Sequence, residues 1–91
     1  MRDYEAVFVF RPEEELYKQG MTLVQEEMSK VGAAITKEED MGNRELAYAV
    51  KGETRGHYHL FEAQMEPEKL VNLRGAILLM EPVLKCLFVR K

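Results

Sequence analysis

Apolar residues recur at two spacings along this chain, and segments of the two kinds alternate. In four segments every second residue is apolar, which is typical of β-strands. The first segment is rich in aromatic and β-branched residues and has apolar residues on both faces, which favours a central strand. The polar stretch KGETRG (51–56) predicts a turn before the third segment, and Gly42 predicts a bend or bulge within the second. The predicted strands are 4–10, 33–40 continued by 44–50, 57–65 and 83–89.

Between these segments apolar residues recur every three or four positions, which predicts two helices. Pro12 is expected to open the first helix and Gly32 to end it, while Gly20 inside it should cost about 1 kcal/mol relative to alanine. The second helix is expected over 66–80, because the residue before Pro82 avoids the helical conformation. The faces expected to be buried are Tyr17, Met21, Val24, Met28 and Val31 in the first helix, and Leu70, Leu73, Ile77 and Met80 in the second.

The resulting order, β-α-β-β-α-β, is the ferredoxin-like pattern of the α+β class. We expect a four-stranded antiparallel sheet with two helices on one face, the other face being left for solvent or a partner. Ninety-one residues predict a single domain over 1–91. No apolar run is long enough for a membrane span, and one cysteine, Cys86, suits a reducing compartment, so we expect a cytoplasmic protein.

The net charge of −3 limits how the chain could bind nucleic acid. Proteins that bind nucleic acid unaided are usually basic. Any RNA contact would therefore need a local basic patch, or a partner that neutralises most of the phosphates.

Few residues of the sequence suggest a catalytic or metal-binding site. His57 and His59 share one strand face, but a zinc site needs three or four ligands and nothing in the sequence clusters with them, so we expect packed histidines and no metal. Cys86 lies in an apolar strand and is expected to be a buried small side chain rather than a nucleophile. The acidic run 38–40 could form a paired-carboxylate site, although a solvated edge is the simpler interpretation. We expect no catalytic residue and no cofactor.

Two known classes with this topology provide alternatives. Acylphosphatases have a glycine-rich anion loop with an arginine after the first strand, and Arg11 stands at that place, but the glutamates at 13–15 would repel a phosphate. RNA-recognition motifs carry outward aromatic residues on their third strand. In RGHYHLFE, Glu62 falls where a buried aromatic belongs, so the register looks inverted and Tyr58 and Leu60 are expected to face outward. A regulatory or acylphosphatase-like domain remains the alternative function.

Four stretches, MRDYEAVFVF, DMGNRELAYAV, GHYHLFEAQ and LFVRK, resemble the bacterial small-subunit ribosomal protein six family, and the resemblance covers essentially the whole chain. It implies the ferredoxin-like fold and no catalytic activity. It also implies a heterodimer with ribosomal protein eighteen, which docks on the central domain of small-subunit (16S) ribosomal RNA. A ribosome-associated protein with no small-molecule substrate and no membrane contact is therefore expected.

The resemblance also suggests where the partner protein binds. The family's partner surface follows the second strand, which lies at the sheet edge, although charges there could simply prevent unwanted strand pairing. Ala49 stands where the family often has proline, and Glu45 where it often has arginine. Val7, Val9 and Leu87 could extend an apolar surface on the open face, unless they pack in the opposite register. The residues expected to bind the partner are Glu39, Asp40, Arg44, Glu45, Tyr58 and Leu60.

RNA contact is expected at a basic corner formed by the two chain ends. The first strand and the last strand should lie side by side, which would bring their terminal residues together. Scattered solvated charge is the competing interpretation, and Lys85 and Arg55 are further candidates. The residues expected to bind RNA are Arg2, Tyr4, Arg90 and Lys91.

Overall fold

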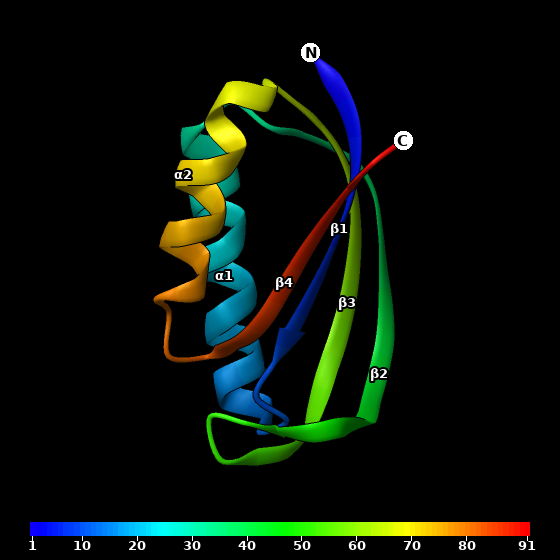
Figure 1. The fold of residues 1–91 in the computed structure, drawn as a ribbon, viewed down its shortest axis with the longest axis vertical. Coiled ribbons are helices and arrows are strands. Elements are labelled where there is room, and N and C mark those ends of the chain that lie inside the picture. Colours follow the sequence, from blue (N-terminus) through cyan, green and yellow to red (C-terminus); the bar gives the residue numbers. More distant parts are fainter.

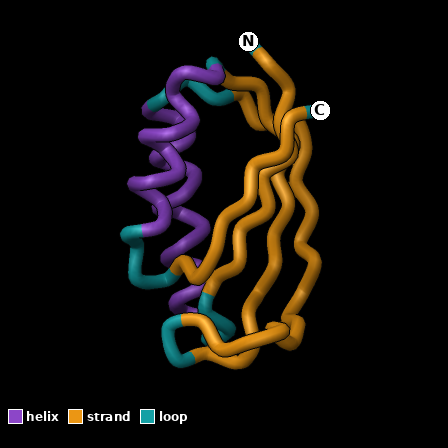
Figure 2. Tube along the Cα trace, in the orientation of Figure 1, coloured by secondary structure: helices purple, strands orange, loops and turns teal.

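The computed structural model describes residues 1–91 as a two-layer sandwich (Figure 1). The four strands form one antiparallel sheet in the order β2-β3-β1-β4, and both helices cover the same face of it (Figure 2). The predicted ferredoxin-like fold is therefore confirmed. The elements are β1 (Arg2–Phe10), α1 (Glu14–Lys30), β2 (Ala34–Val50), β3 (Glu53–Met65), α2 (Pro67–Leu78) and β4 (Val83–Arg90).

The hydrophobic core lies between the helices and the sheet. Phe8, on the central strand β1, is fully buried and makes edge-to-face contacts with Phe61 and Phe88 at centroid distances of 5.6 and 5.7 Å. Every residue of the two predicted helix faces is buried in this core or packs against it, so both faces are confirmed. Cys86 is also buried here, as expected.

Several element ends differ from the predicted ones, three of them by two residues. α1 begins at Glu14 rather than at Pro12, because Glu13 keeps an extended backbone as the capping residue. α2 ends at Leu78, and a turn in which the N–H of Met80 bonds to the carbonyl of Ile77 follows it. β1 begins at Arg2, where pairing with Met65 of β3 extends the strand. Helix and strand ends are the least certain part of a pattern-based prediction.

The β2–β3 turn is much shorter than the predicted six-residue turn. Only Lys51 and Gly52 separate the paired residues Val50 and Glu53. Both have positive φ, +49° and +81°, as a two-residue type I′ turn requires. Lys51 is held there because its Nζ donates to the carbonyl of Val83 at 2.7 Å, with the carbonyls of Leu78 and Met80 at 3.3 and 3.5 Å. The predicted bulge at Gly42 is confirmed: its φ is +79°, and the strand register shifts there.

Gly20 has a packing role that its helix propensity does not reveal. A Cβ at this position would lie 2.5 Å from Cδ1 of the buried Phe10 ring and 3.0 Å from Cβ of Pro82. The missing side chain therefore lets α1 approach β1 closely. Gly75, in α2, has no such neighbour within 4 Å.

These two glycines give a matched prediction. Gly75→Ala should raise the free energy of unfolding by up to about 1 kcal/mol, the gain in helix propensity. Gly20→Ala makes the same gain but forces Phe10 to move, and overpacking a core costs about 1–3 kcal/mol, so this variant should be less stable than wild type. Urea denaturation measures both. Two variants stabilised equally would contradict the close approach at Gly20.

Candidate docking surfaces

The charged residues of β2 lie on an outer strand but are divided between its two faces. Glu39 pairs with Leu60, and Arg44 pairs with Gly56, which places both on the open face of the sheet. Asp40 and Glu45 are on the side of the helices. All four are exposed. The bulge near Gly42 causes this arrangement, because one extra residue reverses the alternation of side chains.

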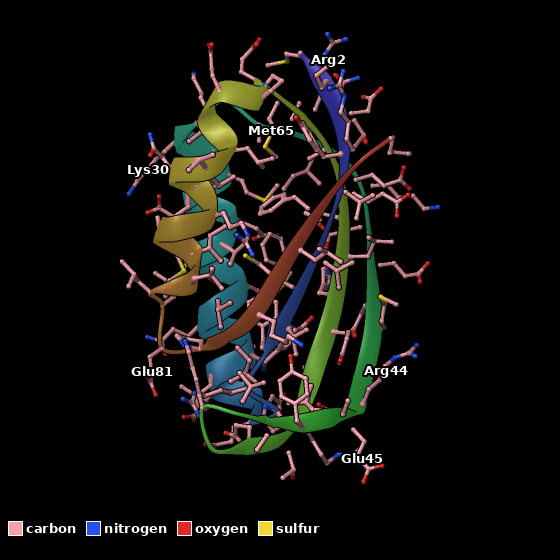
Figure 3. The ribbon with its side chains drawn as sticks, viewed as in Figure 1. Arg2, Lys30, Arg44, Glu45, Met65 and Glu81 are labelled. Carbon is pink, nitrogen blue, oxygen red and sulfur yellow. The ribbon has the colours of Figure 1, made fainter.

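Glu39 and Arg44 have no ion-pair partner. Arg44 points away from the helices (Figure 3), and its guanidinium carbon lies 6.0 Å from the ring centre of Tyr58. The open face therefore presents one negative and one positive group at its β2 edge, and both are available to a binding partner.

Asp40 is not available in the same way. Its Oδ1 accepts hydrogen bonds from the N–H of Gly42 at 2.8 Å and from Nε2 of His57 at 2.6 Å. These bonds, the Gly42 bond above all, lower the pKa of Asp40. Direct contact between Asp40 and a partner stays a prediction, and one of the carboxylate oxygens already holds the bulge.

His57 and His59 share the face toward the helices, as their spacing predicts, and form a cluster with Tyr17 of α1. The Tyr17 ring stacks on His57 at a centroid distance of 3.6 Å, and its hydroxyl is hydrogen-bonded to Nδ1 of His59 at 3.0 Å. Oε1 of Glu38 lies 3.4 Å from Nε2 of the buried His59, too poorly aligned for a hydrogen bond. Burial, together with Asp40 and Glu38, raises the pKa of Tyr17. The sequence pattern did not predict that Tyr17 and Glu38 would join the two histidines. The available signal was a tyrosine on a buried helix face, because its hydroxyl needs a hydrogen-bond partner.

The lowered pKa of Asp40 predicts a pH dependence. A carboxylate whose pKa is lower in the folded state stabilises the fold above its unfolded pKa of about 3.9, and loses this contribution as the pH falls through the folded value. Asp40→Asn should therefore flatten the decline of unfolding free energy in acid, measured by urea denaturation from pH 6 down to pH 2. His57→Phe, which keeps an aromatic ring beside Tyr17 and removes the second donor only, should flatten it less. A decline in Asp40→Asn parallel to that of wild type would contradict this role.

An apolar hollow on the open face beside β4 reaches round this edge strand to Cys86 and Arg74, which come from the helix side. Tyr58 and Leu60 are half-buried and turn toward this face, as predicted, while Leu87 is 58% exposed. Val9 is buried even though it points away from the helices, and Gly56 lies directly against it, since a Cβ there would be 2.4 Å from Cγ1 of Val9. The residues lining the hollow are Val7, Val9, Tyr58, Arg74, Lys85, Cys86 and Leu87.

The two ends of the chain lie together, as predicted. Of the four residues expected to bind RNA, however, only two have side chains that are neither buried nor in an ion pair. Arg90 pairs with Tyr4 in the sheet, so Arg2 and Arg90 lie at the same end, where Figure 1 places both termini. Neither arginine has an ion-pair partner. Lys91 forms an ion pair with Glu62, which raises the pKa of Lys91. The expected RNA contact by the Tyr4 side chain is wrong, because this side chain is 4% exposed and belongs to the core.

The acylphosphatase alternative depends on Arg11, and the structure uses this residue otherwise. Its guanidinium lies 3.1 Å from a carboxylate oxygen of Glu53 and 3.0 Å from one of Glu81. It also donates to the backbone carbonyls of Glu81 and Lys51. Two carboxylates thus occupy the position where a phosphate would have to bind. Arg11 therefore does not serve as the anion-binding arginine that the acylphosphatase alternative requires.

These features define a class of protein: a ferredoxin-like domain with a charged outer strand and an open sheet face. Burial raises the pKa of the Cys86 thiol and keeps it protonated. Neither helix is both long and apolar enough to cross a membrane.

The comparisons with known proteins then identify the family. Residues 3–90 match the model of the ribosomal protein S6 family. The chain is 40% identical to small ribosomal subunit protein bS6 of Treponema denticola over 90 residues, which are 99% of this chain and 97% of that one. It is 42% identical to the protein of the same name from Treponema pallidum, with the same coverage. The chain belongs to the ribosomal protein S6 family, and its role is structural rather than enzymatic.

Solved structures agree on the fold. The crystal structure of 30S ribosomal protein S6 from Thermotoga maritima has a TM-score of 0.86 at 24% identity, covering 99% of this chain and 87% of that one. The C-terminal domain of the MgtC protein from Mycobacterium tuberculosis has a TM-score of 0.68 at 13% identity, covering 100% and 88%. Because these identities are low, both likenesses concern the fold alone.

Proposed function

We propose that this protein is a structural component of the small ribosomal subunit, where it binds the central domain of 16S ribosomal RNA together with ribosomal protein eighteen. The observation that carries this proposal is the exposed β2 edge, where Glu39 and Arg44 stand unpaired beside the half-buried Tyr58 and Leu60. Interfaces of this kind combine an apolar centre with a polar rim. Family membership supports the ribosomal role, which would place the protein in the cytoplasm.

The charge of the chain supports joint rather than independent RNA binding. With a net charge of −3, the protein as a whole does not attract a polyanion. A basic partner on the β2 side would supply the missing phosphate contacts, and the acidic side chains of this chain would attract that partner.

The partner surface in this proposal consists of the open-face residues Glu39, Arg44, Tyr58 and Leu60. Glu45 adds a charge on the other side of the same edge. Asp40 acts indirectly, because it holds the bulge that sets which charges share a face. The unpaired edge of β2 is protected from strand pairing by these charges until the partner binds.

The RNA contact in this proposal rests on Arg2 and Arg90, the two free cations at the end of the sheet near the termini. Lys91 contributes less, because its charge is shared with Glu62. Each phosphate contact adds about 0.9 to the slope of log affinity against log salt concentration.

Sedimentation of ribosomes tests the proposal. A tagged copy of the chain, expressed in a bacterium, should migrate with small subunits in a sucrose gradient and should be released by high salt. Chain that stays at the top of the gradient at low salt, with a folded circular dichroism spectrum, would contradict the proposal.

A further inference from the structure

Tyr48 and Lys85 come from the two opposite edges of the sheet and still touch. β2 and β4 are the outer strands, yet Nζ of Lys85 donates to the Tyr48 hydroxyl at 3.1 Å and lies 4.7 Å from the centre of its ring. Figure 1 shows how this occurs: the far part of the β2–β3 hairpin bends across the end of the sheet.

The bend is built into the fold. Gly56 leaves room for the open-face side chains, since a Cβ there would lie 2.4 Å from Cγ1 of Val9 and 3.6 Å from Cδ2 of Leu46. At the tip of the hairpin, Lys51 and Arg11 join it to the segment between α2 and β4. These bonds fix the hairpin tip close to Tyr48, which is 64% exposed and has Lys85 against its ring.

The residues beside the Tyr48 ring carry positive charge. The polar residues that line the adjoining hollow are Lys85, Arg74 and Tyr58, and no acidic residue lines it. The acidic residues of the open face lie elsewhere: Asp3, Glu5 and Glu62 toward the termini, and Glu39 on β2. In a chain with more acidic than basic residues, this concentration of positive charge fits an anion and repels a basic protein.

We propose that Tyr48, with Lys85 and Arg74, forms a subsite for an unpaired nucleotide of RNA, the base stacking on the exposed ring and the phosphate meeting the two cations. Aromatic rings beside cations bind single-stranded nucleic acid in this way, whatever the base. The inference rests on the proposed function, to which it adds a second RNA contact distant from Arg2 and Arg90. The basic partner protein would occupy the part of the open face around Glu39 and Arg44, and this subsite lies where the bent end of β2 meets β4, with Tyr58 between the two.

Fluorescence tests the subsite directly, because the chain has no tryptophan. Tyr48→Trp should show strong quenching when a single-stranded RNA oligonucleotide is added at low salt, since a base stacks on the indole. Leu79→Trp is the matched control: Leu79 is 89% exposed beyond the end of α2, and the emission of this variant should not change. Equal response of the two variants, or quenching of the Tyr48→Trp variant by ribosomal protein eighteen without RNA, would overturn the subsite.

Affinity for the RNA separates this inference from the proposed function. For the chain bound to ribosomal protein eighteen, Tyr48→Ala should weaken binding to central-domain RNA roughly 5- to 150-fold, while Tyr48→Phe, which keeps the ring, should retain most of the affinity. Lys85→Gln should lower the salt slope by about 0.7 to 0.9. Loss of affinity in an Arg2→Ala, Arg90→Ala variant with none in Tyr48→Ala would reject the subsite alone. Failure of the wild-type pair to bind would reject the proposed function, and the oligonucleotide assay would still decide the subsite.

Discussion

Exchanging the charges of Glu39 and Arg44 is expected to reduce binding to ribosomal protein eighteen by roughly 100-fold, because like charges would then face each other across the interface at a cost of several kcal/mol. The double variant Glu39→Arg, Arg44→Glu keeps the net charge of −3, so a general electrostatic effect is excluded. Both residues are exposed and unpaired with any carboxylate or cation, so the fold should tolerate the exchange. Isothermal titration of the purified chain with the partner measures the affinity.

The control is a second exchange that also keeps the net charge. Glu14 and Lys18 form an ion pair one turn apart on the exposed surface of α1, at 3.1 Å. Glu14→Lys, Lys18→Glu should leave partner binding unchanged and affect stability by only a few tenths of a kcal/mol. If both exchanges bound the partner as wild type does, the β2 edge would not be the partner surface.

Phe8→Ala is expected to lower the free energy of unfolding by about 3–5 kcal/mol, through lost burial and the cavity that remains. Phe8 is fully buried on the central strand, and its ring meets three other phenylalanine rings, those of Phe10, Phe61 and Phe88. A domain of this size has a total free energy of unfolding of roughly 5–10 kcal/mol, so much of its stability depends on the Phe8 ring. Urea denaturation followed by circular dichroism gives the value.

Leu87→Ala is the matched control for Phe8→Ala. Leu87 is also an apolar residue of a strand, but it lies on the open face and is 58% exposed. Its truncation should change stability by less than about 1 kcal/mol. Comparable losses in the two variants would mean that the core does not lie between the helices and the sheet.

Spacing alone was enough to predict the order of elements and the buried helix faces, because burial on one side imposes a period on the sequence. It did not predict the two-residue turn, since Lys51 adopts a conformation that lysine rarely has. The atoms that stabilise it, the carbonyls after α2, are distant in sequence.

The charged β2 edge shows a second limit of prediction from the sequence. Glu39 and Arg44 share a face although one number is odd and the other even, because the bulge near Gly42 shifts the alternation. The sequence indicated a bulge there but not its register. The bonds of Asp40 to His57 depend on that register and became visible only in the structure.

Tyr4 shows a different kind of error. The alternation with Ala6 and Phe8 already placed Tyr4 on the buried face, and the family motif suggested RNA contact instead. The structure agrees with the alternation, as Tyr4 is part of the core. A residue of a family motif can therefore be retained for packing rather than for binding.

The dependence of RNA binding on the partner tests the central claim most directly. Affinity for central-domain 16S RNA would be measured by filter binding for this chain alone, for ribosomal protein eighteen alone, and for both together at one salt concentration. The account predicts weak binding by the chain alone and much tighter binding by the pair than by either protein. Equally tight binding by the chain alone, or no gain when the chain joins its partner, would contradict it.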